Sequence, residues 1–232
     1  MEKINKTQLN IKQAEDRQIV HRDYIAHCLR WSHILRMTNP NQTWLDIGCG
    51  DFPLAMMLYT NKYKPKYYYG VDMRKLENKK PKTNFPVTFY QGDIVKLTEV
   101  DTILYDNIVC LEMIEHVEKK HGQKVLAKIA KLASAKTQIF ISTPVFNGKK
   151  AANHVHEWEY KELQNELSKH FKIVEHFGTF ASQSDIKPHL SSNEMETFAA
   201  MHNYYDSNLL SIMFAPMHPE YSRNVLWRLR IK

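Results

Sequence analysis

Short apolar runs alternate with segments of helical hydrophobic spacing through the middle of the chain. The apolar runs predict strands at 43–48, 66–72, 87–91, 106–111 and 137–143. The first, fourth and fifth of these runs are apolar enough to be buried on both faces of a sheet. Apolar residues at helical spacing predict helices at 53–61 and 118–134, between the strands. This alternation indicates a doubly wound α/β fold, with a parallel sheet and helices on both of its faces.

Helical patterns also stand on either side of this region. Residues 10–36 contain no Pro or Gly and repeat apolar side chains at helical spacing, so we expect one or two helices that end before Asn39 and Pro40. After the fifth strand, the pattern predicts a helix at 158–169, a strand at 172–178, a helical stretch at 192–214 and a last strand at 223–231.

The domain organisation follows from these elements. At 232 residues with 43% hydrophobic residues, the chain suits one domain with a small attachment. We predict an N-terminal helical extension at 1–40, which covers a main domain at 41–232. Residues 179–222 are rich in Met and aromatic residues and precede the last strand, so we expect them to form a small helical cap over a site.

Charge and cysteine usage narrow the choice of partner and compartment. The net charge of +7 at pH 7 favours an acidic partner such as nucleic acid, and a lysine-rich solvated surface explains it equally well. Cys28, Cys49 and Cys110 lack the short spacing of a metal site, which predicts reduced thiols in the cytoplasm. No apolar run is long enough to span a bilayer, and the first residues are polar, so we expect no membrane partner and no secretion signal.

Two glycines stand one residue apart in the stretch "TWLDIGCGDFPLAM", after the first predicted strand. Gly48 permits a tight turn from strand to helix, and Gly50 lets the backbone approach a ligand because it has no Cβ. Pro53 occupies the position of the third glycine of the dinucleotide fingerprint, and the Lys-Ser/Thr pair of a phosphate-binding loop is missing. We therefore expect a loop that contacts a ligand closely without cradling a pyrophosphate.

An acid lies near the end of each of the first three predicted strands. Asp72, in "YYYGVDMRK", is placed to accept both hydroxyls of a ribose. Asp93, in "FYQGDIVKL", is placed near an adenine amino group, and Asp46 near a ligand ammonium. Each acid alone is better explained as a helix cap or a surface residue. Together they indicate a ligand with a ribose, an adenine and a cationic amino acid.

The motifs "LDIGCGD", "GVDMRK", "GDI" and "IVCLEMIEHV", in this order, resemble those of class I S-adenosylmethionine-dependent methyltransferases. The resemblance covers residues 43–178. It implies a seven-stranded mixed sheet of order 3-2-1-4-5-7-6, in which strand 7 is antiparallel and is formed by 223–231. It also implies S-adenosylmethionine as cofactor. The implied cofactor-binding residues are Asp46, Gly48, Cys49, Gly50, Asp72, Met73, Asp93, Ile94 and Glu112.

Residues after the fourth predicted strand are candidates for the chemistry on the acceptor. Glu115 and His116, in "CLEMIEHVEKKHG", are the first candidates for the base or for substrate contact, and His154, in "NHVHEWEYKEL", is the third. With Glu112, these residues are similar to the metal-binding set of the small-RNA 3′-terminal 2′-O-methyltransferases. Two carboxylates and two imidazoles suit a divalent metal. The same spacing is widespread in metal-independent methyltransferases, so the favoured prediction has no metal.

Basic and aromatic residues interleave at both ends of the chain. The segment 10–36 carries Arg and His residues around Tyr24 and Trp31, and the last strand carries Arg228 and Arg230. This mixture suits a phosphate backbone with stacked bases, and it also suits the solvated face of a covering helix. We favour a nucleic acid or a nucleotide as methyl acceptor, with O or N as the acceptor atom.

Two mechanisms of DNA methylation are disfavoured by short motifs. The "STP" after the fifth strand is followed by Val145 and Phe146, unlike the signature of amino-group DNA methyltransferases. No cysteine follows a proline, so the Pro-Cys nucleophile of cytosine-C5 methylation is missing. The stretches "HFGTFASQSDIK" and "PEYSRNVLW" look similar to methyltransferases encoded by tailed phages. That resemblance implies modification of viral DNA or of a modified nucleotide in a host cytoplasm.

Three rival functions remain open at this point. The first is a small-molecule O- or N-methyltransferase, and the second is a metal-dependent RNA 3′-terminal 2′-O-methyltransferase. The third is a module that binds the cofactor without catalysis, against which the intact glycine loop and the three acids argue.

Overall fold

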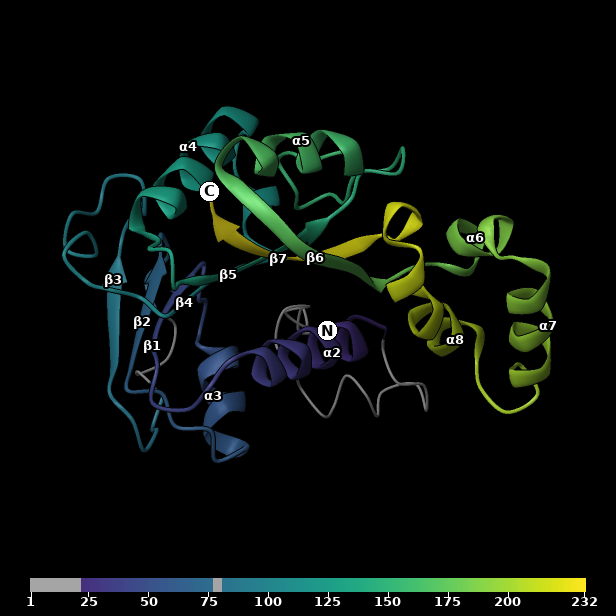
Figure 1. Ribbon diagram of the computed structural model, residues 1–232, viewed down its shortest axis with the longest axis horizontal. Coiled ribbons are helices and arrows are strands. Elements are labelled where there is room, and N and C mark those ends of the chain that lie inside the picture. Colours follow the sequence, from purple (N-terminus) through teal and green to yellow (C-terminus); the bar gives the residue numbers. More distant parts are fainter. Residues whose placement is uncertain (1–21, 77–80) are drawn as a thin grey trace. The chain divides into compact units, whose positions relative to one another are not determined.

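The computed structural model describes residues 22–76 and 81–232 (Figure 1). Its strands are β1 (Thr43–Ile47), β2 (Tyr67–Asp72), β3 (Val87–Gln91), β4 (Asn107–Leu111), β5 (Gln138–Pro144), β6 (Phe171–Phe180) and β7 (Asn224–Ile231). Its α-helices are α2 (Arg22–Met37), α3 (Pro53–Thr60), α4 (Lys119–Leu132), α5 (Tyr160–His170), α6 (Gln183–Ile186), α7 (Ser192–Met201) and α8 (Ser207–Phe214).

The strands form one mixed seven-stranded sheet of order β3-β2-β1-β4-β5-β7-β6. The pairs β1–β2, β1–β4, β2–β3 and β4–β5 are parallel. The order predicted from the sequence is confirmed, and the first five strands begin and end within one residue of their predicted bounds. Because these five strands are parallel, their carboxyl ends meet at one edge of the sheet, which is where α/β folds place their ligands.

The core lies on both faces of the central strands. Every residue of β1 and β5 is buried, as the apolar runs predict. Trp44, Leu45 and Ile139 are among the side chains with no more than 1% of their surface exposed. In Figure 1, α4 and α5 lie over one face of the sheet and α3 lies over the other. The doubly wound architecture therefore holds for the central strands.

The neighbourhood of β3 departs from regular strand–helix alternation. Among the described residues, neither the β2–β3 connection (73–76 and 81–86) nor the β3–β4 connection (92–106) contains a helix. The strand β3 is also the edge of the sheet. The end of the sheet at β2 and β3 thus has less helical cover than its centre.

The chain divides into two compact units, which we call the sheet unit (34–176 and 226–232) and the helical unit (described residues 22–33 and 177–225). The helical unit has its own core, formed by Ala181, Ile186, Phe198, Leu210, Phe214 and Ala215. Its boundaries differ from the predicted extension at 1–40 and cap at 179–222. The role of 179–222 as a cap over a site stays a prediction.

Two of the predicted helical segments differ in extent from the helices of the structure. The predicted helical stretch 192–214 contains two helices, α7 and α8. Asp206 caps the second by accepting hydrogen bonds from the backbone N–H groups of Asn208 (2.8 Å) and Leu209 (3.1 Å). Of the helical segment 10–36, the described part is α2, and residues 10–21 lie outside the described residues. None of the helices in the described part of the chain combines the length and apolar character that crossing a membrane requires.

Candidate active site

The turn after β1 is built by backbone that ordinary residues disfavour. Gly48 and Gly50 have φ angles of +79° and +50°, and Phe52, the N-cap of α3, is also left-handed at +63°. The N–H of Gly48 donates to the carbonyl of Val71 at 2.8 Å, which ties the turn to β2. A Cβ at Gly48 would collide with the side chain of Met113. The expected tight turn is present, with positive φ and lack of space both requiring glycine at position 48.

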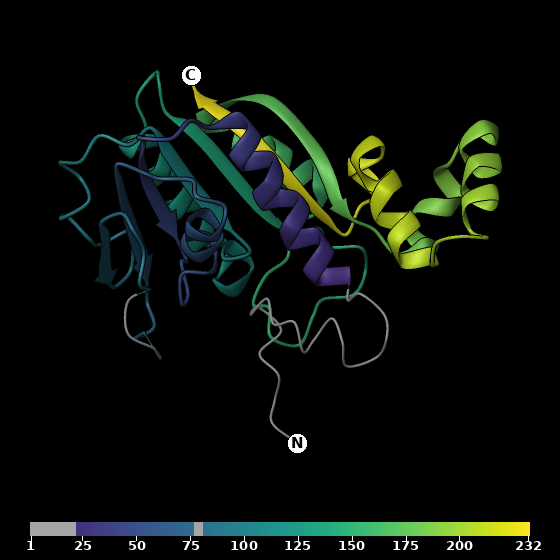
Figure 2. The same cartoon turned by 90° about the horizontal axis from the view of Figure 1, so that it is seen from below.

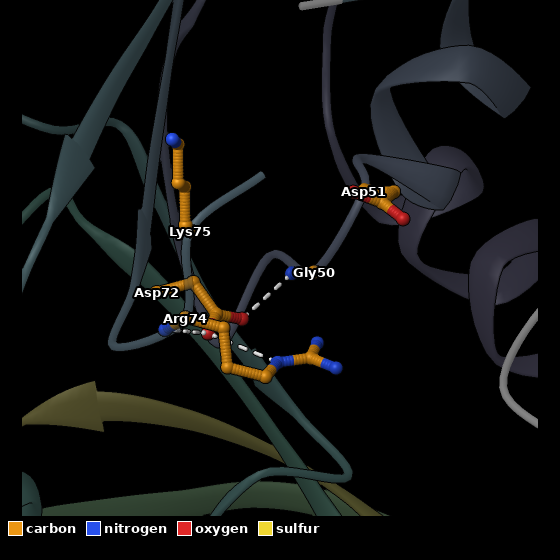
Figure 3. Close-up of a pocket in the computed structure, with 5 residues that line it drawn as sticks. All are labelled: Gly50, Asp51, Asp72, Arg74 and Lys75. Carbon is orange, nitrogen blue, oxygen red and sulfur yellow. Dashed lines mark hydrogen bonds and ion pairs between the residues drawn. The ribbon is translucent and has the colours of Figure 1, made fainter. Parts of the chain in front are cut away.

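Asp72, at the end of β2, is oriented by two backbone donors. The N–H of Gly50 donates to Oδ2 at 2.9 Å and the N–H of Arg74 donates to Oδ1 at 2.8 Å (Figure 3). Each carboxylate oxygen has two lone pairs, so both oxygens keep capacity for further donors. A pocket here is lined by Gly50, Asp51, Asp72, Arg74 and Lys75. This geometry suits an acid that accepts two neighbouring hydroxyls.

Asp46 has a different environment from the one expected of a ligand-binding acid. Its carboxylate is buried, with 5% exposed, and accepts a 2.5 Å hydrogen bond from the hydroxyl of Tyr68. Burial, and secondarily the charge of nearby Asp72, raise the pKa of Asp46 to about 7, although the hydrogen bond from Tyr68 opposes this. The contact of Asp46 with a ligand ammonium stays a prediction.

Asp93 follows β3 and has a partner that sequence reasoning missed. Its Oδ1 accepts a hydrogen bond from the N–H of Val95 at 3.0 Å and lies 3.2 Å from Nε2 of His121, in the first turn of α4. The neighbouring Ile94 is buried, whereas Met73, after β2, is 63% exposed. His121 stands 28 residues from Asp93, and its place in "EKKHG" gives no sign of this pairing.

Glu112, at the end of β4, has strained backbone. Its φ of +54° is left-handed, which costs a non-glycine residue about 1–2 kcal/mol. The surroundings stabilise this conformation from β5: its N–H donates to the carbonyl of Ser142 at 2.9 Å, and the Ser142 hydroxyl donates to its Oε1 at 2.8 Å. Non-glycine residues held in this region cluster at functional sites, so the strain marks this strand end as a candidate site.

Glu115 and two histidines come together just beyond β4. Glu115 is 1% exposed, and its Oε2 accepts a 3.0 Å hydrogen bond from the hydroxyl of Thr143. One potential ligand atom from each of Glu115, His116 and His154 lies within 4.8 Å of the others, and the two imidazole centroids are 5.0 Å apart. Glu112 does not join this group. Three of the four residues of the predicted metal set therefore converge.

The tautomers of the two histidines follow from their partners. His116 Nδ1 lies 3.0 Å from the carbonyl oxygen of Asn153, and His154 Nδ1 lies 2.5 Å from Oε1 of Glu157. Because a carbonyl and a carboxylate only accept, Nδ1 carries a proton on each ring, and in the neutral form of the ring Nε2 is left with a lone pair. Burial, more than any other factor, lowers the pKa of His116 below its usual 6.5.

His154 belongs to a loop whose two ends are joined. Val145 and Trp158 form an isolated parallel bridge, and the N–H of Phe146 donates to the carbonyl of Trp158 at 2.8 Å. Within the loop, the N–H of Val155 donates to the carbonyl of Glu115 at 2.8 Å. These contacts bring the sequence-distant His154 to the end of β4.

A family model described as a methyltransferase domain matches residues 17–179. The chain belongs to this family. It is an S-adenosylmethionine-dependent methyltransferase, so the predictions of enzyme class and cofactor are confirmed. No curated protein matches the chain.

Solved structures share the fold of this methyltransferase. The small RNA methyltransferase HEN1 has a TM-score of 0.60 and 17% identity, over 89% of this chain and 25% of that chain. The N-methyltransferase NodS from Bradyrhizobium japonicum, in complex with S-adenosylhomocysteine, has a TM-score of 0.56 and 12% identity, over 89% and 87%. The 1,6-didemethyltoxoflavin-N1-methyltransferase from Burkholderia thailandensis has a TM-score of 0.61 and 15% identity, over 96% and 85%. These likenesses concern the fold and leave the acceptor open.

The predicted site residues of the methyltransferase all lie after the carboxyl ends of β1 to β5 or in those strands. The residues that sequence reasoning missed support them from neighbouring elements: Tyr68, His121, Ser142, Thr143 and Glu157. Ser142 and Thr143 lie in the "STP" motif, but nothing in that motif indicates contacts with Glu112 and Glu115, and Tyr68 and His121 belong to no motif at all. A weak signal existed only for Glu157, which stands three residues after His154 in "HVHEWEY".

Proposed function

We propose that this methyltransferase transfers the methyl group of S-adenosylmethionine to an O or N atom of a nucleic acid or of a modified nucleotide. The observation that carries the proposal is the set of exposed cations in two segments that also carry predicted site residues. Arg74, 66% exposed, follows β2, and the exposed Lys149 and Lys150 stand in the loop that carries His154. Cations around a site for methyl transfer favour an acceptor that bears phosphates.

The cofactor would lie across the carboxyl ends of the first three strands. We assign its ribose to Asp72, its adenine to Met73, Asp93 and Ile94, and its methionine part to the turn of Gly48, Cys49 and Gly50, with Asp46 and Glu112 beside it. The support for this assignment is the pair of backbone donors that fix Asp72 and the small pocket that Asp72 lines together with Gly50. The sulfonium supplies an electrophilic methyl group, and the protein's work is to align the acceptor with it.

His116 is our candidate for the general base. Its Nε2 has a lone pair, its side chain is 38% exposed, and Glu115 Oε1 lies 3.9 Å from Nε2. As an acceptor hydroxyl or amine attacks the methyl group, Nε2 would take its proton, and the buried Glu115 carboxylate would stabilise the imidazolium that forms. The ring of His154 is nearly perpendicular to that of His116, with centroids 5.0 Å apart, and would border the acceptor on that side.

The test is methyl transfer from radiolabelled S-adenosylmethionine to duplex DNA, single-stranded DNA, RNA, free nucleotides and a metabolite extract. We expect label in a polynucleotide or nucleotide fraction, and loss of label in His116→Ala with unchanged cofactor binding. His202→Ala, in the helical unit, is the matched control and should keep full activity. Label confined to the small-molecule fraction would refute the proposal and establish the small-molecule rival.

A specific observation also favours a second candidate, a metal-dependent RNA 3′-terminal 2′-O-methyltransferase. One ring nitrogen of each histidine and a carboxylate oxygen of Glu115 converge, and the Nδ1 of each histidine lies against an acceptor, as in many metal-binding histidines. Glu115, His116 and His154 would hold the ion, which would orient the ribose hydroxyls of an RNA end. Ligand atoms on one zinc ion lie about 3.4 Å apart, so the group would have to close slightly.

Metal dependence separates the two candidates. Isothermal titration of the purified protein with Zn²⁺ or Mn²⁺ should show a site that Glu115→Gln and His154→Gln abolish and His202→Gln retains. Label in RNA that disappears with a chelator and returns with Mn²⁺ would establish the second candidate. Label in a polynucleotide that is indifferent to the chelator would leave the first.

A further inference from the structure

Tyr67 and Tyr69 of β2 and Tyr90 of β3 form a row of tyrosines on one face of the sheet. The register pairs Tyr69 with Thr88 and Val71 with Tyr90, so the alternate residues of both strands share that face. The rings of Tyr69 and Tyr90 are within 6° of parallel, with centroids 6.3 Å apart, and the centroid of Tyr67 lies 6.3 Å from that of Tyr69. Tyr67 is 43% exposed and the other two are half-buried.

The two faces of β2 differ in cover. On the opposite face, Tyr68 is fully buried and its ring contacts Phe52 at the start of α3. On the face of the tyrosine row, the β3–β4 connection has no helix among its described residues 92–106 and contributes Tyr105, whose ring meets the edge of Tyr69 at 5.9 Å. Side chains this large are thus left at the surface of the sheet itself.

Three lysines precede the row along the chain, and the last of them contacts it. The loop before β2 and its first residues read "NKYKPKYYYG", in which Lys62, Lys64 and Lys66 are exposed and no acid occurs from 59 to 71. Lys66 Nζ lies 5.9 Å from the ring centroid of Tyr67. Within the described part of the chain, none of these three lysines forms an ion pair with a carboxylate. Their charge is therefore available to an anionic partner.

We propose that the tyrosine row and these three lysines form a binding surface for single-stranded nucleic acid. Exposed bases stack on aromatic rings whatever their sequence, and lysines beside the rings neutralise the phosphates that join the bases. Duplex fits less well because its bases are already stacked on each other. Three lysines with no acid among them match the repeated negative charge of a phosphate chain.

The position of the row gives the surface a role in the proposed reaction. Tyr90 pairs with Val71, the residue before Asp72, so the row leads from the lysine loop at the start of β2 to the strand ends that carry the candidate site. A single strand bound along the row would run toward that edge of the sheet. This choice of partner rests on the proposed function, since the acceptor is then part of the bound strand.

The test is fluorescence anisotropy of labelled oligo(dT) and oligo(U) with the full chain at low salt, without cofactor. Tyr67→Ala should weaken binding about tenfold, as loss of one stacking platform does, and Tyr67→Phe should retain it. Replacing Lys62, Lys64 and Lys66 by Gln should reduce the slope of log K against log salt by about 2, at about 0.7 per lysine. Duplex of the same length should bind more weakly than single strands.

Two exposed residues elsewhere are matched controls. Tyr204→Ala, at a tyrosine 83% exposed in the helical unit, and Lys172→Gln, at an exposed lysine of β6, should bind oligonucleotides as the wild type does. Absence of oligonucleotide binding by the wild type, or equal binding by Tyr67→Ala and Tyr204→Ala, would overturn the proposal. So would a self-association that Tyr67→Ala abolishes while oligonucleotide binding persists, because the face would then belong to a second copy of the chain.

Binding and catalysis report separately on the surface and on the proposed function. Weakened binding in Tyr67→Ala, together with a wild type that labels only small molecules, would support the surface and refute the function. If the wild type methylates a polynucleotide, and Tyr67→Ala binds oligonucleotides as tightly as the wild type, the surface is refuted and the function stands.

Discussion

The hydroxyl of Tyr68 donates a 2.5 Å hydrogen bond to the carboxylate of Asp46, beneath the turn that leads to Gly48. Both side chains are buried, and the two residues belong to adjacent strands, β1 and β2. The hydrogen bond favours the ionised carboxylate, but burial outweighs it and raises the pKa of Asp46 to about 7. An acid that titrates near neutral pH in this place ties the stability of the fold to pH.

The first prediction concerns that titration. The folded protein holds the Asp46 proton more tightly than the unfolded chain, so this contribution to stability is full below pH 4 and is lost as pH rises to about 7. Asp46→Asn should remove this dependence, which amounts to at most about 4 kcal/mol. The measurement is the free energy of unfolding in urea at pH 4.5 to 8. Glu196→Gln, at an exposed acid, should show the wild-type profile, and equal profiles for wild type and Asp46→Asn would contradict the prediction.

The second prediction compares two glycines with positive φ. Gly48→Ala adds a Cβ that collides with Met113, whereas Gly148→Ala, at φ +95°, adds one in open space. Gly148→Ala should cost about 1 kcal/mol of backbone strain alone. Gly48→Ala should cost several times more and should reduce cofactor affinity. Thermal unfolding with and without S-adenosylmethionine measures both effects, and equal losses in the two variants would show that the collision is relieved.

The third prediction tests the ribose acid. Asp72→Ala removes the carboxylate and leaves the N–H groups of Gly50 and Arg74 without their acceptor. Affinity for S-adenosylhomocysteine should fall at least tenfold, because ribose hydroxyls would lose a charged partner worth about 1.5–3 kcal/mol each. Isothermal titration calorimetry checks this. Asp51→Asn, at another acid of the same pocket, should have a smaller effect, and an unchanged affinity in Asp72→Ala would move the ribose elsewhere.

The fourth prediction concerns the pH dependence of methyl transfer. A base must be neutral to accept a proton, and burial lowers the pKa of His116 below 6.5. The rate should therefore decline at acid pH with a midpoint below the usual 6.5 of a histidine. His116→Gln should lose most of the activity and the acidic limb of the profile together. An acidic limb that persists in His116→Gln would assign the titration to another group.

The sequence predicts the framework because its signals are local. The buried strands β1, β4 and β5 are continuous apolar runs, and "DIGCGD" needs glycine for reasons of backbone geometry alone. Each of these features is confirmed within one residue or at the glycine itself. The ends of elements such as 192–214 are harder, because one cap residue, Asp206, decides whether a helical pattern is one helix or two.

The residues that support the site could not be predicted, because their contacts join segments that are distant in the sequence. Tyr68 reaches Asp46 from the neighbouring strand through the register of β1 and β2. His121, in α4, reaches Asp93 over 28 positions through the packing of that helix against the loop after β3. Glu112 has a left-handed backbone although its sequence context, "CLEM", is that of an ordinary strand end. Contacts of this kind depend on tertiary placement, and no periodicity along the chain encodes them.

The bridge between Val145 and Trp158 fixes both ends of the loop between them. Joining the ends of a flexible segment of about a dozen residues costs about 2 kcal/mol of entropy. Here that cost is met once, during folding, and it does not recur each time an acceptor arrives. His154 is therefore held at a high effective concentration beside His116, and substrates of different shape would meet the same arrangement of imidazoles.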